Sequence, residues 1–118
     1  MPDELDLALA GLTAVYQPVV HLETRDVLGY EALARGAAGS PLEQPQALLA
    51  AAREAGRTAE VDWRCRDAAL GGALAAGLGS TLTVFVNIEP DTDAAVPAAY
   101  RDRIAAAEDG LRVVIEVT

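Results

Sequence analysis

Two almost uninterrupted apolar runs, LTVFVNI (82–88) and LRVVIEV (111–117), do most to limit what this chain can fold into. Such runs are typical of strands that are covered on both faces of a sheet. The sequence between them predicts a turn at EPDTDAAV (89–96) and a helix that ends near Ala107, where EDG (108–110) breaks it. Strands that alternate with helices favour an α/β layer with parallel strands.

The opening of the chain predicts a short helix followed by a β-hairpin. The helix covers residues 3–11. Two runs rich in β-branched and aromatic residues, 12–22 and 27–36, predict strands joined by the polar turn ETRD (23–26). Pro18 predicts that the first strand is an edge strand or an irregular one, because proline has no N–H to donate to a neighbouring strand.

The middle of the chain predicts two helices. A loop of small residues and prolines (37–45) leads to a helix over 46–55, and a second helix covers 58–77. Gly71 and Gly72 each weaken the second helix by up to ~1 kcal/mol relative to alanine. Such a pair is understandable where a helix packs closely on a sheet.

Composition excludes several classes of function. The net charge is -9, and all nine basic residues are arginines, so a duplex-binding surface, a Walker phosphate loop and a Schiff-base lysine are not expected. The single cysteine, Cys65, makes no internal disulfide or zinc site. The acidic start does not resemble a signal peptide, and no apolar stretch reaches the ~18 residues of a membrane span. We therefore expect a cytoplasmic protein.

One polar side chain stands in each of three predicted strands: Glu31, Asn87 and Glu116. Each is predicted near the carboxyl end of its strand, which is where parallel α/β folds bind ligands. A buried carboxylate is costly unless it is paired or bound to a metal. Two carboxylates and an amide suit Mg²⁺ or Mn²⁺ better than zinc, and such metals orient phosphates and activate water. From the pattern alone, structural roles for these three residues remain equally open.

Glu31, Leu33 and Arg35 lie on the same side of their strand, because side chains alternate with period two. Glu31 and Arg35 are then about 13 Å apart, at roughly 3.3 Å per residue. That spacing is too long for a salt bridge and suits two ends of one extended anionic ligand. A salt bridge between Arg35 and another acid is the alternative.

The remaining candidates have structural interpretations. His21 is the only histidine and stands beside a turn, which favours a structural or surface role. Trp63 and Cys65 are expected to pack in the core. Asp62 is expected to be an acid on the helix surface, with a role near the ligand-binding rim as the alternative.

Four motifs together resemble the first half of the EAL domain family, which comprises cyclic-di-GMP phosphodiesterases. They are YQPVV (16–20), GYEALARG (29–36), VFVNIEP (84–90) and LRVVIEVT (111–118). The resemblance implies an α/β fold, a modified TIM-like (β/α)₈ barrel with one antiparallel strand. It divides the chain into a lead-in helix over 1–12 and the N-terminal half of an EAL domain over 13–118.

The resemblance also implies an activity and a ligand set. The family uses Mg²⁺ or Mn²⁺ to hydrolyse cyclic di-GMP to linear pGpG. By correspondence, the metal ligands are Glu31, Asn87 and Glu116, and the substrate-binding residues are Arg35, Gln17 and Leu33. The family's second half supplies an Asp-Asp pair and a catalytic lysine, which this sequence lacks. No complete catalytic set is therefore expected in these 118 residues.

Two local departures and two alternatives accompany the resemblance. Gly36 stands where the family often has an aromatic residue, and Glu89 where it often has a small hydroxyl residue. We expect the isolated chain to be inactive and to form a homodimer or swapped assembly through open sheet edges. Its parent is expected to carry sensory or diguanylate cyclase domains. The alternatives are a degenerate module that binds cyclic di-GMP or pairs with proteins without catalysis, and an unrelated α/β interaction domain.

Overall fold

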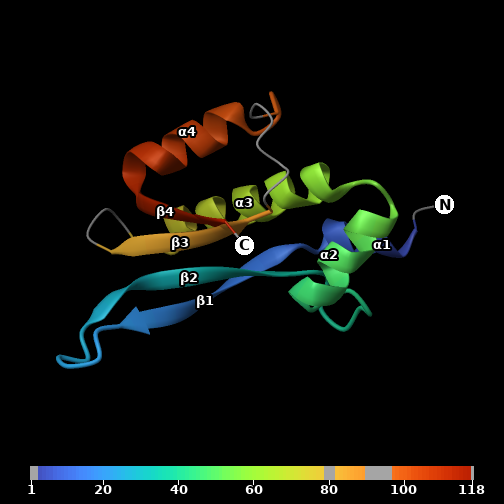
Figure 1. Cartoon of the computed structure of the whole chain (residues 1–118). Coiled ribbons are helices and arrows are strands. Elements are labelled where there is room, and N and C mark those ends of the chain that lie inside the picture. The colour runs from blue at the N-terminus through green and yellow to red at the C-terminus, as the bar shows by residue number, and fades with distance from the viewer. Residues whose placement is uncertain (1–2, 79–81, 90–96, 118) are drawn as a thin grey trace.

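The computed structural model of the chain, which describes residues 3–78, 82–89 and 97–117, has the predicted α/β order of elements (Figure 1). The elements are α1 (Glu4–Ala10), β1 (Thr13–Val20), β2 (Val27–Arg35), α2 (Pro45–Glu54), α3 (Thr58–Ala75), β3 (Thr83–Ile88), α4 (Arg101–Gly110) and β4 (Arg112–Val117). The expected break at 108–110 is wrong, because α4 continues to Gly110. Most of the predicted turn at 89–96 lies outside the described residues.

The strands form one sheet in the order β1-β2-β3-β4. β1 is antiparallel to β2, while β2, β3 and β4 run parallel. Of the two alternatives that Pro18 predicts for the first strand, an edge strand or an irregular one, the sheet order confirms the edge strand. The alignment of residues across the sheet places Gln17 opposite Glu31, and Asn87 beside Glu116.

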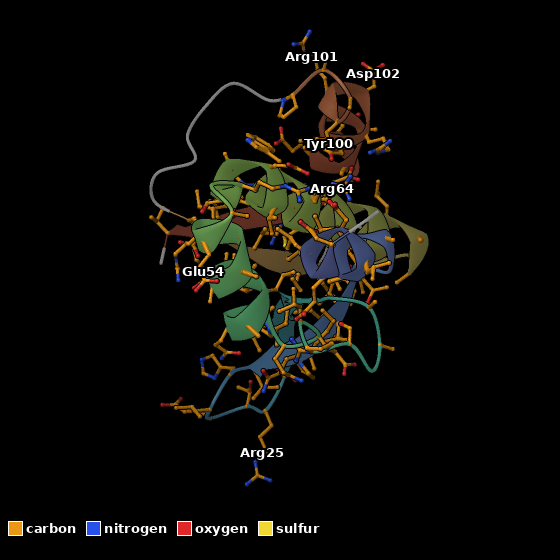
Figure 2. All side chains as sticks on the ribbon, turned by 90° about the vertical axis from the view of Figure 1, so that its right-hand side faces the viewer. Arg25, Glu54, Arg64, Tyr100, Arg101 and Asp102 are labelled. Carbon is orange, nitrogen blue, oxygen red and sulfur yellow. The ribbon has the colours of Figure 1, made fainter. Side chains whose placement is uncertain are left out.

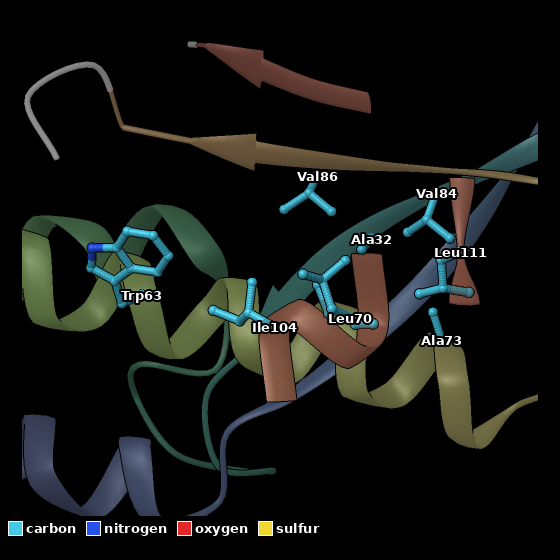
Figure 3. Close-up of a cluster of buried hydrophobic side chains, with 10 residues drawn as sticks. Ala32, Trp63, Leu70, Ala73, Val84, Val86, Ile104 and Leu111 are labelled. Atoms are coloured by element: carbon cyan, nitrogen blue, oxygen red, sulfur yellow. The ribbon is translucent and has the colours of Figure 1, made fainter. Parts of the chain in front are cut away.

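One face of the sheet is covered by α3 and α4 (Figure 3). Ala32, Val84 and Val86 point from the strands to this side, where they meet side chains of the two helices and of the segment that follows them. The helical partners include Trp63, Leu70, Ala73 and Ile104, together with Leu111. Because strand side chains alternate, the neighbours of these strand residues must lie on the opposite face.

α3 lies close to β1 at Gly72, one of the two glycines where close packing is predicted. The Tyr16 hydroxyl donates a 2.6 Å hydrogen bond to the carbonyl of Ala69, and a Cβ at Gly72 would overlap that hydroxyl. Nothing lies near a Cβ placed at Gly71. Close packing therefore explains Gly72 and does not explain Gly71.

A second core joins α1 and α2 to the start of α3. It contains Leu5, Ala8 and Leu9 of α1, and Leu48 and Ala52 of α2. At its rim, Arg57 forms ion pairs with Asp6 and Glu60, both at 2.8 Å. The N-terminal helix is thus tied to the rest of the chain by burial and by charge.

β4 is less covered than its apolar sequence predicts. Val114, Ile115 and Val117 are 40%, 48% and 64% exposed, so the expectation of a strand covered on both faces is wrong here. β4 lies at the edge of the described sheet, and the buried cluster reaches it only through Val113 and the preceding Leu111.

Charged side chains are spread around the outside of the molecule. Arg25 projects from the hairpin turn, and Arg101 and Asp102 project from the opposite end (Figure 2). In the part of the chain that the structure describes, no helix is long and apolar enough to cross a membrane.

Candidate functional site

The face of the sheet turned away from α3 carries a row of polar side chains, and we call it the polar face. Tyr16, Ala32 and Val86 point toward α3, so their neighbours Gln17, Glu31 and Asn87 lie on the polar face. Glu116 joins them because it pairs with Asn87 in the parallel ladder. Four residues from four strands are therefore brought together: Gln17, Glu31, Asn87 and Glu116.

Glu31 and Asn87 are in direct contact. The Asn87 amide Nδ2 donates a 3.0 Å hydrogen bond to Oε2 of Glu31. Gln17 lies directly opposite Glu31, and Glu116 lies one strand beyond Asn87, where neighbouring strands are about 4.8 Å apart. Each side chain offers at least one oxygen, so the row is a set of hard donors.

The sequence predicts Glu31 near the carboxyl end of its strand, and this prediction is wrong. Glu31 lies in the middle of β2, which continues to Arg35 because β1 pairs with it over that whole length. Asn87 and Glu116, by contrast, are the second-to-last residues of β3 and β4. The polar row therefore includes a residue from the middle of β2 and residues from the carboxyl ends of β3 and β4.

Arg35 ends β2 on the same face as Glu31, with Leu33 between them. Its Nη1 donates to the carbonyl oxygen of Ala34 at 2.9 Å. Among the residues that the structure describes, no carboxylate pairs with this guanidinium. The alternative of a structural salt bridge at Arg35 finds no support there.

Gly36 is explained by the loop that follows it. Its N–H donates to the carbonyl of Glu43 at 2.9 Å, and a Cβ at this position would overlap the carbonyl of Leu42. A side chain at Gly36 would therefore displace the loop.

Asp62 is not on the helix surface, and that expectation is wrong. The residue is 3% exposed, and its Oδ2 lies 2.7 Å from Nη2 of Arg66. Its Oδ1 accepts a 3.1 Å hydrogen bond from the backbone N–H of Glu89. The spacing of Asp62 and Arg66, four residues apart on one helix, is the signal that would have indicated a pair.

The Glu89 carboxylate points to α2, where it lies 3.4 Å from Nη2 of Arg53. Its side chain is 14% exposed, so it does not simply face solvent. This contact turns the carboxylate toward the helix layer.

The other candidates take structural roles. Trp63 is buried in the core, as predicted, with the Arg66 guanidinium 4.1 Å from its ring centroid. Burial raises the pKa of the Cys65 thiol to about 12, which leaves almost no thiolate at neutral pH. His21 Nδ1 accepts the N–H groups of Glu23 and Thr24 in the hairpin turn.

The polar row supplies oxygen atoms, the kind of ligand that hard divalent cations prefer. Within residues 3–78, 82–89 and 97–117, no three His, Cys, Asp or Glu side chains come close enough together to hold a metal ion. Glu31, Asn87 and Glu116 nonetheless supply two carboxylates and one amide on a single face. Mg²⁺ commonly takes only one or two protein carboxylates and fills its shell with water or phosphate.

Comparison with known proteins gives one family. The model of the EAL domain matches residues 4–118. A search of curated protein sequences found no match.

Three solved structures show the range of similar folds. BlrP1 of Klebsiella pneumoniae, in a calcium and cyclic-di-GMP complex, is 24% identical with a TM-score of 0.69 over 99% of this chain. The EAL domain of Xanthomonas citri FimX, in complex with cyclic di-GMP, is 23% identical with a TM-score of 0.67 over 95%. Bacillus subtilis YkuI, with an EAL domain, substrate cyclic di-GMP and calcium, is 26% identical with a TM-score of 0.65 over 99%.

The chain spans only part of these proteins: 29% of BlrP1, 47% of the FimX chain and 31% of YkuI. The first two likenesses, at the lower identities, concern the fold alone. Another BlrP1 structure holds manganese with cyclic di-GMP, so the divalent ions in these neighbours include calcium and manganese.

Proposed function

The chain belongs to the EAL domain family, and on that premise we propose that it is part of a metal-dependent cyclic-di-GMP phosphodiesterase. The reaction is hydrolysis of cyclic di-GMP to linear pGpG. The observation that carries the proposal is the 3.0 Å contact between Asn87 and Glu31, with Glu116 on the adjacent strand of the same face. These three residues would hold Mg²⁺ or Mn²⁺.

Each residue of the polar face has a role in this proposal. A bound divalent cation supplies Lewis-acid polarisation of a phosphate and a more acidic water. Arg35 would bind a phosphate oxygen through its guanidinium, since bidentate hydrogen bonds of this kind suit phosphate. Gln17 would donate to the ligand beside Glu31, and Leu33 would contact its apolar part. Because Glu31 and Arg35 are four residues apart on β2, the cation held by Glu31 and the phosphate oxygen bound by Arg35 would lie at two separate points along the strand.

The 118 residues alone are proposed to bind without hydrolysing. The family's Asp-Asp pair and lysine do not occur in this sequence, so one side of the reacting phosphate is not served by these residues. The test is calorimetric titration of the chain with Mn²⁺ and then with cyclic di-GMP, combined with chromatographic assay for pGpG. Metal-dependent pGpG production by this chain would overturn its proposed inactivity, and no binding of either ligand would overturn the site.

The second candidate is a module that binds cyclic di-GMP or a protein without catalysis. The observation that favours it is that Arg35 ends β2 on the same face as the polar row, an arrangement that suits the binding of an anionic ligand without any hydrolytic group. Assay of the parent protein separates the two: cyclic-di-GMP binding with no pGpG under saturating Mn²⁺ supports the binding module.

Pairing through the sheet edges is proposed as a further property of the chain. β1 and β4 are the edges of the described sheet, and β4 presents Val114, Ile115 and Val117 largely exposed. Exposed apolar edge strands invite pairing with another chain. Light scattering across a concentration series tests this, and a monomer at every concentration would contradict the proposed homodimer or swapped assembly.

The remaining parts of the proposal concern context. We place the protein in the cytoplasm, with sensory or diguanylate cyclase domains elsewhere in its parent. We also propose the division into a lead-in helix over 1–12 and half an EAL domain over 13–118. Fractionation of cells and the parent sequence test these points.

A further inference from the structure

Asp62 is an unusual residue for the inner side of a helix. Among the described residues it is the one charged residue that is buried, at 3% exposure. Both of its oxygens are used: Oδ1 accepts from the Glu89 N–H at 3.1 Å, and Oδ2 accepts from Arg66 Nε at 2.9 Å. Burying a carboxylate is unfavourable unless it is paired, so an apolar residue would be the simpler choice for stability.

Arg66 holds the Asp62 carboxylate in place through a hydrogen bond and an ion pair. Its side chain is 12% exposed, and its guanidinium lies over the Trp63 ring at 4.1 Å from the centroid. Trp63 itself belongs to the buried cluster under the sheet. Asp62 is therefore a fixed acceptor, since its partner is packed against the core.

The group that Asp62 fixes lies at the end of β3. The ladder between β3 and β4 ends at Ile88, and Glu89 follows directly. Asn87, two residues before Glu89, is held on the polar face by its hydrogen bond to Glu31. The carboxyl end of β3 is thus held from both faces of the sheet, by Glu31 on one side and Asp62 on the other.

We propose that Asp62 is a positioning residue: it fixes the end of β3 through the Glu89 amide and so aims the Asn87 side chain at Glu31. The positioning stands on the hydrogen bonds alone. Its consequence for a metal ion rests on the proposed function. Partners that orient metal ligands typically change metal affinity about 10–100-fold when they are removed.

Three variants separate positioning from general stability. Asp62→Ala removes the acceptor for the Glu89 N–H. Asp62→Asn keeps an acceptor oxygen but loses the charge that pairs with Arg66. Asp67→Ala is the matched control on the same helix, because Asp67 pairs with Arg103 of α4 at 2.9 Å.

The main measurements need no metal. On the ¹⁵N-labelled 118-residue chain, hydrogen exchange of the Glu89 amide reports its bond to Asp62, and the side-chain amide resonances of Asn87 report its bond to Glu31. In Asp62→Ala we expect exchange at Glu89 to speed up at least about tenfold and the Asn87 resonances to move, as a lost hydrogen bond requires. Mn²⁺ affinity, by calorimetry, should fall about 10–100-fold.

Asp62→Asn should melt at a lower temperature and yet keep the Glu89 protection, the Asn87 resonances and the Mn²⁺ affinity. A purely structural role would instead make all three follow the melting temperature. Asp67→Ala should leave the two NMR signals unchanged.

Several results would overturn the inference. One is unmoved Asn87 resonances in folded Asp62→Ala, and another is an equal change in Asp67→Ala. If Asp62→Ala does not fold, the wild type and Asp62→Asn decide. An unprotected Glu89 amide in the wild type, or displaced Asn87 resonances in Asp62→Asn, would overturn the inference. A protected Glu89 amide together with unmoved Asn87 resonances in Asp62→Asn would support it. A wild-type chain that binds no Mn²⁺ counts against the proposed function, while the NMR measurements still decide the role of Asp62.

Discussion

Asn87 of β3 donates its side-chain amide to the carboxylate of Glu31 on β2, across 3.0 Å and between residues 56 positions apart in the chain. The bond joins two parallel strands on the face that no helix of the buried cluster covers. The second carboxylate oxygen of Glu31 and the amide oxygen of Asn87 are acceptors that this bond does not use.

Glu31→Gln tests whether this carboxylate binds metal. The substitution keeps the size of the side chain and removes its charge, so Mn²⁺ affinity should fall at least about tenfold while the melting temperature changes little. Calorimetry measures the affinity. Glu54→Gln, at the exposed end of α2, is the control and should bind Mn²⁺ as the wild type does (Figure 2). Equal affinities for all three proteins would remove Glu31 from the metal site.

Arg35→Met tests the phosphate contact. Loss of a hydrogen bond to a charged group costs about 1.5–3 kcal/mol, so cyclic-di-GMP binding should weaken by that amount while Mn²⁺ affinity stays. Arg25→Met removes an arginine that projects from the hairpin turn, and it controls for net charge (Figure 2). A weaker Mn²⁺ affinity in Arg35→Met, or unchanged cyclic-di-GMP binding, would contradict the assignment.

Gly71 and Gly72 allow a matched comparison on one helix. Gly71→Ala should stabilise the chain by up to ~1 kcal/mol, because alanine favours the helix and nothing lies near the added Cβ. Gly72→Ala gains the same preference but displaces the Tyr16 hydroxyl from Ala69, which costs ~0.5–1.5 kcal/mol or more. Urea denaturation should therefore rank Gly71→Ala above Gly72→Ala. The reverse ranking would contradict the packing of α3 on β1.

Stability should fall at acidic pH through the Arg57 ion pairs. Hydrogen bonds from Arg57 hold the pKa of Asp6 below 3.8 and that of Glu60 below 4.5. A carboxyl whose pKa is lowered by folding stabilises the protein above its unfolded pKa, and this contribution is lost as pH falls through the folded pKa. The free energy of unfolding should therefore drop below about pH 4.5 in the wild type, and less steeply in Arg57→Met. Parallel curves for the two proteins would exclude these pairs as the cause.

The order and type of the elements could be predicted because their signals are local. β3 follows from its apolar run, and Pro18 limited β1 to an edge strand or an irregular one. α4 passes through Glu108 and Asp109 because both are exposed and cost the helix little. The cover over β4 could not be predicted, since it depends on which elements lie beside that strand and not on its own residues.

The residues of the polar face could be predicted, but the position of each residue along its strand could not. The sequence predicted Glu31, Asn87 and Glu116 near the carboxyl ends of three strands, and the register brings the three residues to one face of the sheet. The position of Glu31 within β2 depends on how far β1 pairs with it. The burial of Asp62 depends on Glu89, 27 positions away, and no local pattern reports such a contact.

The sheet also has a consequence for the order of folding. β1 and β2 are neighbours in sequence and close a short loop, whereas Gly29 of β2 aligns with Thr83 of β3. Contacts between distant residues form at a greater cost in chain entropy, and parallel pairs are slow for that reason. We expect the hairpin to appear early and the contact between Asn87 and Glu31 to be among the last to form. In a refolding experiment, the native fluorescence of Trp63 in α3 should therefore return before, or together with, the ability to bind a cation.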